Sequence, residues 1–482
     1  MSRGKYIVQI DFTLVKYMAP SPQNAVQTKF DEKLGRHPGM RTSSTDWQQL
    51  PVPGGHSAAV KDVAWDPTGS YLLSCSMDQT TRLWAPIRTD KADGIGTCIY
   101  ELCRPQVHGH DLQCVTAVNS RCFVSGAEEK LLRAFIMPKS FVDCATSLCT
   151  TAFCDSLNLN NVPLSAVGAS LPSLGLSNKA VAESSDDPSH YFESKTYNHS
   201  PIEEDLSQNT LWPEVHKLYG HGFEIFSVAC NNAGTVLASA CKASQSEHAS
   251  IILWSTDVSC VSDCWQQRAA LRAHTLTCTA IRFAHNDRYL LTVSRDRSWA
   301  VHKCDPQGAF SWTLCAQSTK GDGGHTRIIW DCAWAPDDRA FFTVSRDKKC
   351  IAWSVDEQNN VIVVKHIHSA SLLDSATACD TAPSIVNGST LLAIGLECGD
   401  IHVFYWCATS GFSTSLSVIN AHSFIIHRVR FRPVIGQWPS DCDDQPISDE
   451  RAVFSLASCG DDHLVAVWTI DTAMLSTFDQ EL

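Results

Sequence analysis

The sequence predicts an all-β protein of the β-propeller class, in which four-stranded sheets are arranged around a central axis. Residues 54–84 show the pattern of one such sheet. A Gly-His pair precedes an alternating strand, an Asp follows the second strand, and a Trp ends the third strand. Parts of this pattern recur along the chain, and a recurring Gly-His to Trp pattern is the known signature of the WD repeat.

The strands and turns of this first repeat follow from its local sequence. Residues 60–65 alternate between apolar and polar side chains, which is typical of a strand with one half-buried face. Residues 66–69 (DPTG) predict a turn, because Pro fixes φ and Gly tolerates the left-handed conformation. Residues 71–76 are expected to form the second strand, residues 77–79 a tight turn, and residues 80–84 the third strand.

The polar residues of this repeat predict a structural hydrogen-bond network at one rim of the propeller. His56 precedes the first strand and Asp78 follows the second, so both are expected at the same end of the sheet. Asp78 can accept from the His56 imidazole, and Ser74 can connect the other imidazole nitrogen to the Trp84 indole. Ser, His and Asp also form hydrolase triads. We expect a structural role, because the combination recurs whereas an active site occurs once.

Seven repeats are visible, two before residue 137 and five after residue 210. The fifth and the seventh keep the pattern of the first, so the same structural network is expected in them. Its residues there are His325, Asp347 and Trp353 in the fifth repeat and His422, Asp462 and Trp468 in the seventh.

The other four repeats depart from the pattern. The second opens at His110 and has Glu129 in place of Asp. The third carries a long loop at residues 242–250, so its rim network is predicted to be absent or altered. In the fourth, His302 replaces the terminal Trp. The sixth is the weakest repeat and has Cys398 where the Asp is expected.

The spacing of the repeats divides the chain into four parts. Residues 1–46 match no repeat and are predicted to be a leader. Residues 47–136 hold two repeats and residues 211–482 hold five. Between them, residues 137–210 are expected to form a linker-like insertion with a degenerate hairpin that turns at Ser177-Asn178. A domain boundary is expected in this insertion, because connections of this length are uncommon inside one domain.

Composition limits the classes of function. The net charge is −13, so nucleic-acid binding through a generally basic surface is not expected. The 22 cysteines include no CxxC pair, which favours buried free thiols in a reducing compartment. Cys144, Cys149 and Cys154 match no standard zinc spacing. We find no convincing signal peptide and no apolar run of membrane length, so no membrane partner is expected.

Several segments are more specific than a generic repeat. Among them are DQTTRLWAP, RPQVHGHDLQC, VSGAEEKLLRAF, LGLSNKAV, QNTLWPEVHKLYGHGFEIF, VSRDRSW, HTRIIWDCAW and AIGLECG. Together they resemble the Elongator complex protein 2 family over about residues 47–482. They include loops and insertions that packing alone does not dictate, which makes the resemblance specific.

This resemblance implies a non-catalytic scaffold made of two consecutive seven-bladed propellers. It also implies other Elongator subunits as partners, including the large scaffold and the catalytic subunit, and a supporting role in modifying the wobble uridine of certain tRNAs. Only a leader precedes the first repeat here, so the chain is expected to match the family's C-terminal part. The last two blades of an incomplete first propeller would precede a complete second propeller. A single closed ring of seven repeats, with the insertion looped out, is the alternative.

Basic residues flank the rim positions of the fourth and fifth repeats. They are Arg295, Arg297, Arg327, Arg346, Lys348 and Lys349. Because these cations converge on one face of an acidic protein, they predict a partner-binding patch for RNA, tubulin or an acidic protein segment. The alternative is that exposed turns favour charged residues and that each cation pairs with its neighbouring Asp.

Two further classes of function are weighed against the scaffold. A peptide-reading adaptor, such as a ubiquitin-ligase substrate receptor or a chromatin-binding module, would also use a basic propeller face. An enzyme is disfavoured, because no polar cluster lies outside the register of the repeats. We therefore predict a protein of the cytoplasm and nucleus without catalytic residues, cofactor or metal.

Overall fold

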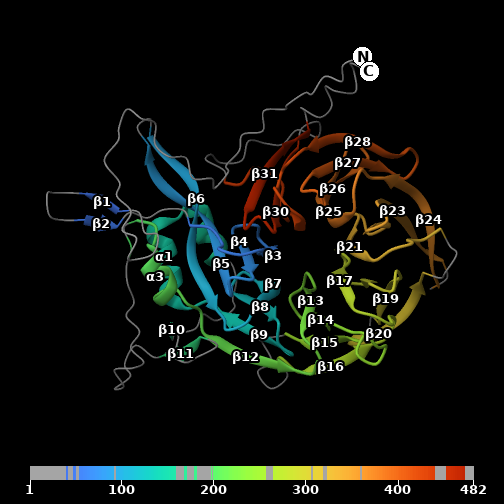
Figure 1. Ribbon diagram of the computed structural model, residues 1–482, viewed down its shortest axis with the longest axis horizontal. Helices are drawn as coiled ribbons and strands as arrows, with labels where there is room; N and C mark the ends of the chain where they lie inside the picture. Colours follow the sequence, from blue (N-terminus) through green and yellow to red (C-terminus); the bar gives the residue numbers. More distant parts are fainter. Residues whose placement is uncertain are drawn as a thin grey trace, which may run out of the picture.

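A computed structural model describes most of the chain as seven β-sheets arranged as blades around one axis (Figure 1). The described residues are 39–41, 47–49, 54–91, 94–158, 168–170, 178–181, 197, 199–256, 264–305, 308–318, 323–358, 361–439 and 452–472. The predicted leader, residues 1–46, lies almost wholly outside them. We number the blades 1 to 7 in chain order.

The blades are antiparallel sheets of short strands. Blade 1 contains β3 (Val60–Trp65), β4 (Leu72–Ser76), β5 (Thr80–Lys91) and β6 (Gly94–Val107). Blade 2 contains β7 (Leu112–Asn119), β8 (Cys122–Ala127), β9 (Leu131–Ile136) and β12 (Glu214–Tyr219). Blade 3 contains β13 (Ile225–Cys230), β14 (Val236–Cys241), β15 (Ile251–Ser255) and β16 (Gln267–Leu271).

The remaining blades follow the same order. Blade 4 contains β17 (Cys278–Phe283), β18 (Tyr289–Ser294), β19 (Trp299–Asp305) and β20 (Gly308–Gln317). Blade 5 contains β21 (Ile329–Trp334), β22 (Ala340–Ser345), β23 (Lys349–Gln358) and β24 (Val361–Ser371). Blade 6 contains β25 (Ala376–Val386), β26 (Ser389–Leu396), β27 (Ile401–Cys407) and β28 (Gly411–Val418), and blade 7 has β29 (Ile426–Phe431), β30 (Val453–Gly460) and β31 (Val465–Asp471) among the described residues.

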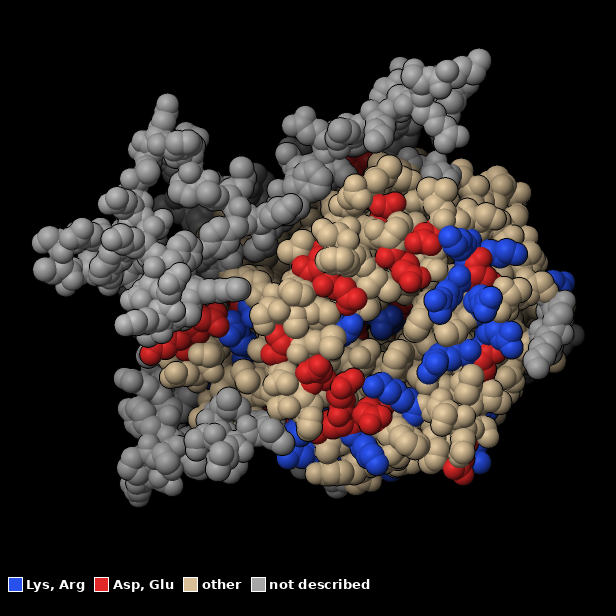
Figure 2. Space-filling view, viewed as in Figure 1, with Lys and Arg blue, Asp and Glu red and all other residues tan. Residues whose placement is uncertain are grey.

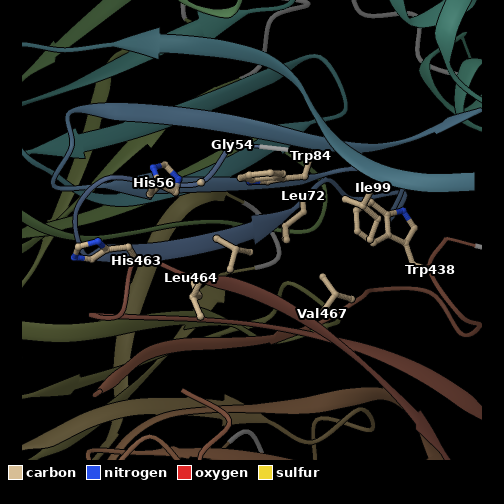
Figure 3. A pocket seen from close by; sticks show the side chains of 11 residues that line it. Gly54, His56, Leu72, Trp84, Ile99, Trp438, His463, Leu464 and Val467 are labelled. Carbon is tan, nitrogen blue, oxygen red and sulfur yellow. The ribbon is translucent and has the colours of Figure 1, made fainter. Parts of the chain in front are cut away.

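Blades 1 and 7 pack against each other and close the ring. Arg428 Nε of blade 7 lies 3.0 Å from Asp62 Oδ1 of blade 1, and the Trp65 indole donates to the Arg430 carbonyl at 3.1 Å. Apolar contacts continue along this seam, where Leu464 and Val467 face the Leu72 side of blade 1 (Figure 3). The expectation of an incomplete first propeller followed by a second one is therefore wrong, and the single seven-bladed ring is the architecture observed.

The sheet of blade 2 crosses the insertion and explains this correction. Its outer strand β12 follows the insertion, yet it pairs with β9, which precedes the insertion, from Glu214 opposite Phe135 to Tyr219 opposite Leu131. A domain boundary in the insertion would split this sheet. The long connection is instead an elaboration within one blade.

The insertion contains helices packed against blades 1 and 2. Helix α1 (Lys139–Leu148) buries Phe141, Cys144, Ala145 and Leu148, and helix α2 (Thr151–Asn158) follows it. The Phe141 ring lies 5.6 Å from the ring of Trp212, which precedes β12. Apolar residues at positions i, i+3, i+4 and i+7 form one face of a helix. This part of the insertion is therefore folded, where the sequence predicts a linker.

The end of the insertion is held to the outer edge of blade 1. Strands β10 (Gly168–Ser170) and β11 (Lys179–Val181) pair with Ser170 opposite Lys179, so residues 171–178 separate them rather than a two-residue turn at Ser177-Asn178. The buried Asn178 amide donates to the carbonyls of Pro105 and Trp212. Helix α3 (Glu203–Gln208) is joined to β6 by the ion pair of Arg104 with Glu203 at 2.7 Å.

The core lies between neighbouring blades, as the seam between blades 4 and 5 illustrates. Trp299 of blade 4 contacts Trp353 and Phe341 of blade 5, with ring centroids 5.0 and 5.2 Å apart. Each blade thus buries its faces against its two neighbours. Within the described ranges, none of the helices is both long and apolar enough to cross a membrane.

Replacing Phe141 by Ala is expected to destabilise the protein by about 3 kcal/mol, because a buried aromatic ring is lost from the contact between α1 and Trp212. Urea unfolding followed by tryptophan fluorescence measures the effect. Asp143→Ala, on the exposed side of the same helix, is the control and should change stability by less than about 0.5 kcal/mol. Equal effects of the two variants would show that α1 is not docked.

Candidate functional site: the rim face and its basic patch

The rim of blade 1 holds a chain of four hydrogen-bonded side chains. The Trp84 indole donates to Ser74 Oγ at 2.9 Å, Ser74 Oγ lies 2.7 Å from His56 Nε2, and His56 Nδ1 lies 2.9 Å from Asp78 Oδ2. The geometry fits an imidazole with its proton on Nδ1, so that Ser74 donates to Nε2. We call this chain, and its equivalents in other blades, the rim network.

Blades 5 and 7 contain the same chain. In blade 5, His325 connects Asp347 at 3.1 Å to Thr343 at 2.9 Å, and the Trp353 indole donates to Thr343 at 2.9 Å. The predicted residues are therefore together, and Thr343 supplies the hydroxyl that Ser74 supplies in blade 1.

In blade 7, His422 connects Asp462 at 2.9 Å to Ser458 at 2.7 Å, and the Trp468 indole donates to Ser458 at 2.8 Å. The hydroxyl residues Thr343 and Ser458 were not among the predicted residues. Their equivalence to Ser74, ten positions before the terminal Trp, was the signal that would have found them.

The other blades keep only part of the network. In blade 3 the Trp254 indole donates to Ser239, and Ser239 is hydrogen-bonded to His221. Among the described residues, no carboxylate accepts a hydrogen bond from this histidine. In blade 4, Ser298 bridges His274 and Asp296, with 2.9 Å to the imidazole and 2.5 Å to the carboxylate.

Blade 2 uses a different histidine from the one that the sequence indicates. His108 Nε2, rather than His110, lies 2.9 Å from Glu129 Oε1. The His110 backbone N–H donates to His108 Nδ1, so both histidines belong to one loop and only the earlier one reaches the carboxylate. The spacing was the signal that would have found it, because the histidine precedes the carboxylate by 22 residues in blades 1 and 5 and His108 precedes Glu129 by 21.

The ionisation of the rim network follows from its burial. Burial lowers the pKa of His56, so the imidazole is neutral. Burial also disfavours the Asp78 carboxylate, but the hydrogen bond from His56 and the charge of Arg82 outweigh it and hold the pKa of Asp78 well below its usual range. Ser74 is fully buried, and its hydroxyl is occupied by Trp84 and His56. The arrangement fixes the loop before each blade to the turn within it and offers no nucleophile to solvent.

The six basic residues of the predicted patch lie on the face that carries the rim networks. All six are exposed. Arg295 and Arg297 flank Asp296 in blade 4, and Arg346 and Lys348 flank Asp347 in blade 5. The two blades are joined at this face by Arg297 Nη1, which donates to the Thr326 carbonyl at 3.5 Å.

The acidic neighbours of this patch are engaged elsewhere. Asp347 faces His325, and Asp296 accepts from Ser298 and from the Thr275 backbone. Within the described part of the chain, Lys348 forms an ion pair with Asp374 at 3.1 Å, and the other five cations of the patch form none. Figure 2 shows Lys and Arg side chains gathered over the region of β19 to β24, with acidic side chains gathered on other parts of this face. The alternative that each cation pairs with its neighbouring Asp does not hold here.

Metal binding finds no support in the described segments. None of them brings together three or more His, Cys, Asp or Glu side chains in a group that could hold a metal ion. Cys144 and Cys149 are buried in the core around α1, where burial raises the pKa of both thiols.

Comparison with a protein-family model agrees with this geometry. The model described as "WD domain, G-beta repeat" matches residues 47–85, 212–255, 265–302 and 316–354. The protein is a β-propeller that contains WD repeats. The four matches fall on blades 1, 3, 4 and 5, and the match at residues 212–255 includes β12 together with three strands of blade 3.

Comparison with curated proteins finds relatives that share one name, Elongator complex protein 2. The chain is 39% identical to that of Danio rerio over 472 residues, which cover 90% of this chain and 56% of the relative. For Homo sapiens the identity is 36% over 89% of this chain and 54% of the relative, and for Arabidopsis thaliana it is 34% over 90% and 53%. The similarity thus extends over most of this WD-repeat chain, which spans about half the length of the relatives it matches.

Replacing Ser74 by Ala is expected to lower the free energy of unfolding by about 2 kcal/mol, because the Trp84 indole and His56 Nε2 both lose a buried partner. Ser74→Thr is the control, since Thr343 fills the equivalent place in blade 5. Chemical denaturation of both variants measures the effect. If Ser74→Ala is as stable as the wild type, the rim network contributes nothing to stability.

Acid is expected to destabilise the protein partly through His221. Burial lowers the pKa of His221 to about 4, whereas an unfolded histidine titrates near 6.5. Between these values the unfolded chain binds a proton that the folded chain does not, so stability is full above pH 6.5 and falls as the pH drops toward 4.

His221→Gln should therefore reduce the loss of stability between pH 7 and pH 5 by about 2 kcal/mol, measured by urea unfolding at the two pH values. The exposed His110 provides the control variant His110→Gln, which should leave the pH dependence unchanged. An unaltered pH dependence in His221→Gln would contradict the assignment.

Proposed function

We propose that this protein is a non-catalytic scaffold subunit of an Elongator-type complex. The observation that carries the proposal is the similarity to Elongator complex protein 2 over about 90% of the chain, at 34 to 39% identity across fish, human and plant relatives. The buried rim networks add to it, because they account for the repeated Ser, His and Asp residues without any catalytic role.

On this proposal, the ring presents its rim face to the other Elongator subunits, including the large scaffold and the catalytic subunit. The complex would modify the wobble uridine of certain tRNAs, in the cytoplasm and the nucleus, with the chemistry done by the catalytic subunit. A peptide-reading adaptor, such as a substrate receptor or chromatin module, is the alternative function for a propeller with a basic face.

Affinity purification of the tagged full chain from cells of its own species tests this proposal. We expect stoichiometric recovery of the large scaffold and the catalytic subunit, measured by quantitative mass spectrometry. Recovery of ubiquitin-ligase or chromatin assemblies in their place would contradict it and support the adaptor function.

The basic patch is proposed as the surface for an anionic partner, either RNA, tubulin or an acidic protein segment. Its support is the set of exposed, mostly unpaired cations on blades 4 and 5. The turns between the first and second strands of each blade lie on the opposite face, so residues there provide matched controls.

Arg295→Glu combined with Arg346→Glu is expected to weaken binding of the purified complex to tRNA or to microtubules at least tenfold at low salt. Filter binding and co-sedimentation measure the two interactions. The control is Arg339→Glu combined with Arg288→Glu, which makes the same change in net charge in two turns on the opposite face. Equal binding by the two double variants would show that the patch is not a binding surface.

A further inference from the structure

The axis of the ring is hollow and is divided at Arg428. An upper chamber of about 240 Å³ is lined by residues from every blade, one from each of blades 1 to 6 and three from blade 7. A lower chamber of about 390 Å³ is lined by β3, β7, β13, β17 and β29. Arg428 lines both chambers. The lower chamber reaches residues such as Pro67 and Asn232, which belong to turns on the face opposite the rim networks.

Three guanidinium groups meet at this division and compete for one carboxylate. Asp331 of blade 5 is fully buried and accepts from Arg282 at 3.1 Å, from Arg428 at 3.2 Å and, at the longer distance of 3.5 Å, from Arg430. Arg428 also forms an ion pair with Asp62, in which Nε lies 3.0 Å from Oδ1. Arg282 completes its hydrogen bonds with the carbonyls of Cys332 and Ile281. Arg430 is therefore the guanidinium with the weakest carboxylate contact.

The free edge of Arg430 is the one suited to bidentate binding. Its Nη1 donates to the Val429 carbonyl at 2.6 Å, whereas its Nε and Nη2 have no hydrogen bond to any residue that the structure describes. These two groups are the parallel donors of a guanidinium, which match two oxygens of a carboxylate or phosphate. Arg430 lines the lower chamber, with 14% of its side chain exposed.

The Asp380 carboxylate leaves the Nε and Nη2 edge of Arg430 free. Asp380 accepts from the Phe431 backbone N–H at 2.8 Å and forms no ion pair with Arg430 among the described residues. Burial, opposed by the charge of Arg282, raises the pKa of Asp380 to about 6. The carboxylates of Asp62, Asp331 and Asp380 thus balance the charges of the three guanidinium groups overall, and the unfilled Nε and Nη2 edge of Arg430 is the feature that a bound anion would complete.

We propose that the lower chamber is a binding site for a small oxyanion, a phosphate or carboxylate group held by the Nε and Nη2 edge of Arg430. Its volume falls within the range of small-molecule sites. The hydroxyl of Thr116, which lines the same chamber without a hydrogen bond to the described residues, supplies a further donor. The site faces away from the rim and is independent of the Elongator-type function.

Isothermal titration of the purified full chain with inorganic phosphate, and separately with acetate, tests the proposal at constant ionic strength. We expect saturable binding of at least one of them, and the stronger of the two identifies the group that the chamber takes. Arg430→Gln should lower the association constant at least tenfold. Arg339→Gln removes one cation from the same face outside the chamber and should leave it unchanged.

Arg430→Lys keeps the charge but loses the two parallel donors, and it is expected to bind several-fold more weakly than the wild type. If Arg430→Gln does not fold, this variant decides the question. Absence of saturable binding to the wild type, or an equal affinity in wild type and the Arg430 variants, would overturn the proposal.

Discussion

A propeller is stable only when its last blade packs against its first, because an open ring leaves the faces of two sheets unpacked and exposes their edges. In this protein the buried Asp62 makes several of the contacts that close the ring. Its carboxylate accepts from Arg428 of blade 7 and from the Val115 backbone of blade 2, so one side chain joins three blades. Arg428 also forms an ion pair with Asp331, which connects blade 7 to blade 5. Removing one partner of such a buried pair leaves an uncompensated charge, which typically costs ~3–5 kcal/mol.

The hydrogen bonds of the rim network stabilise single blades, whereas the ion pairs at the axis hold different blades together. The rim network fixes a loop to a turn inside one blade, as in the chain from Trp84 to Asp78. The axial charges fix the blades relative to one another. Because the turns are held by buried bonds, the basic side chains beside Asp296 and Asp347 project from fixed positions on one face. The same closure places Arg282, Arg428 and Arg430 around one chamber.

The sequence predicts those features that are local and repeated. The strands of blade 1 and the His56, Ser74, Asp78 and Trp84 cluster follow from residues within one repeat. Ring closure does not, because Asp62 and Arg428 lie 366 residues apart and neither belongs to the repeat pattern. The helical insertion was misjudged because polar tracts mask the spacing of Phe141 and Leu148. The exposure of the patch follows from its position in turns, whereas the engagement of Asp296 and Asp347 depends on groups such as Ser298 and His325 that the fold brings to them.

A double-mutant cycle on the seam between blades 1 and 7 shows whether the ring is closed. Free energies of unfolding of the wild type, Asp62→Asn, Arg428→Gln and the double variant give the coupling energy of the pair. The closed ring predicts a coupling of at least about 1 kcal/mol, because the two side chains share a buried contact. If the free-energy changes of the two single variants add to that of the double variant within about 0.5 kcal/mol, blades 1 and 7 do not meet at this pair and the ring is not closed there.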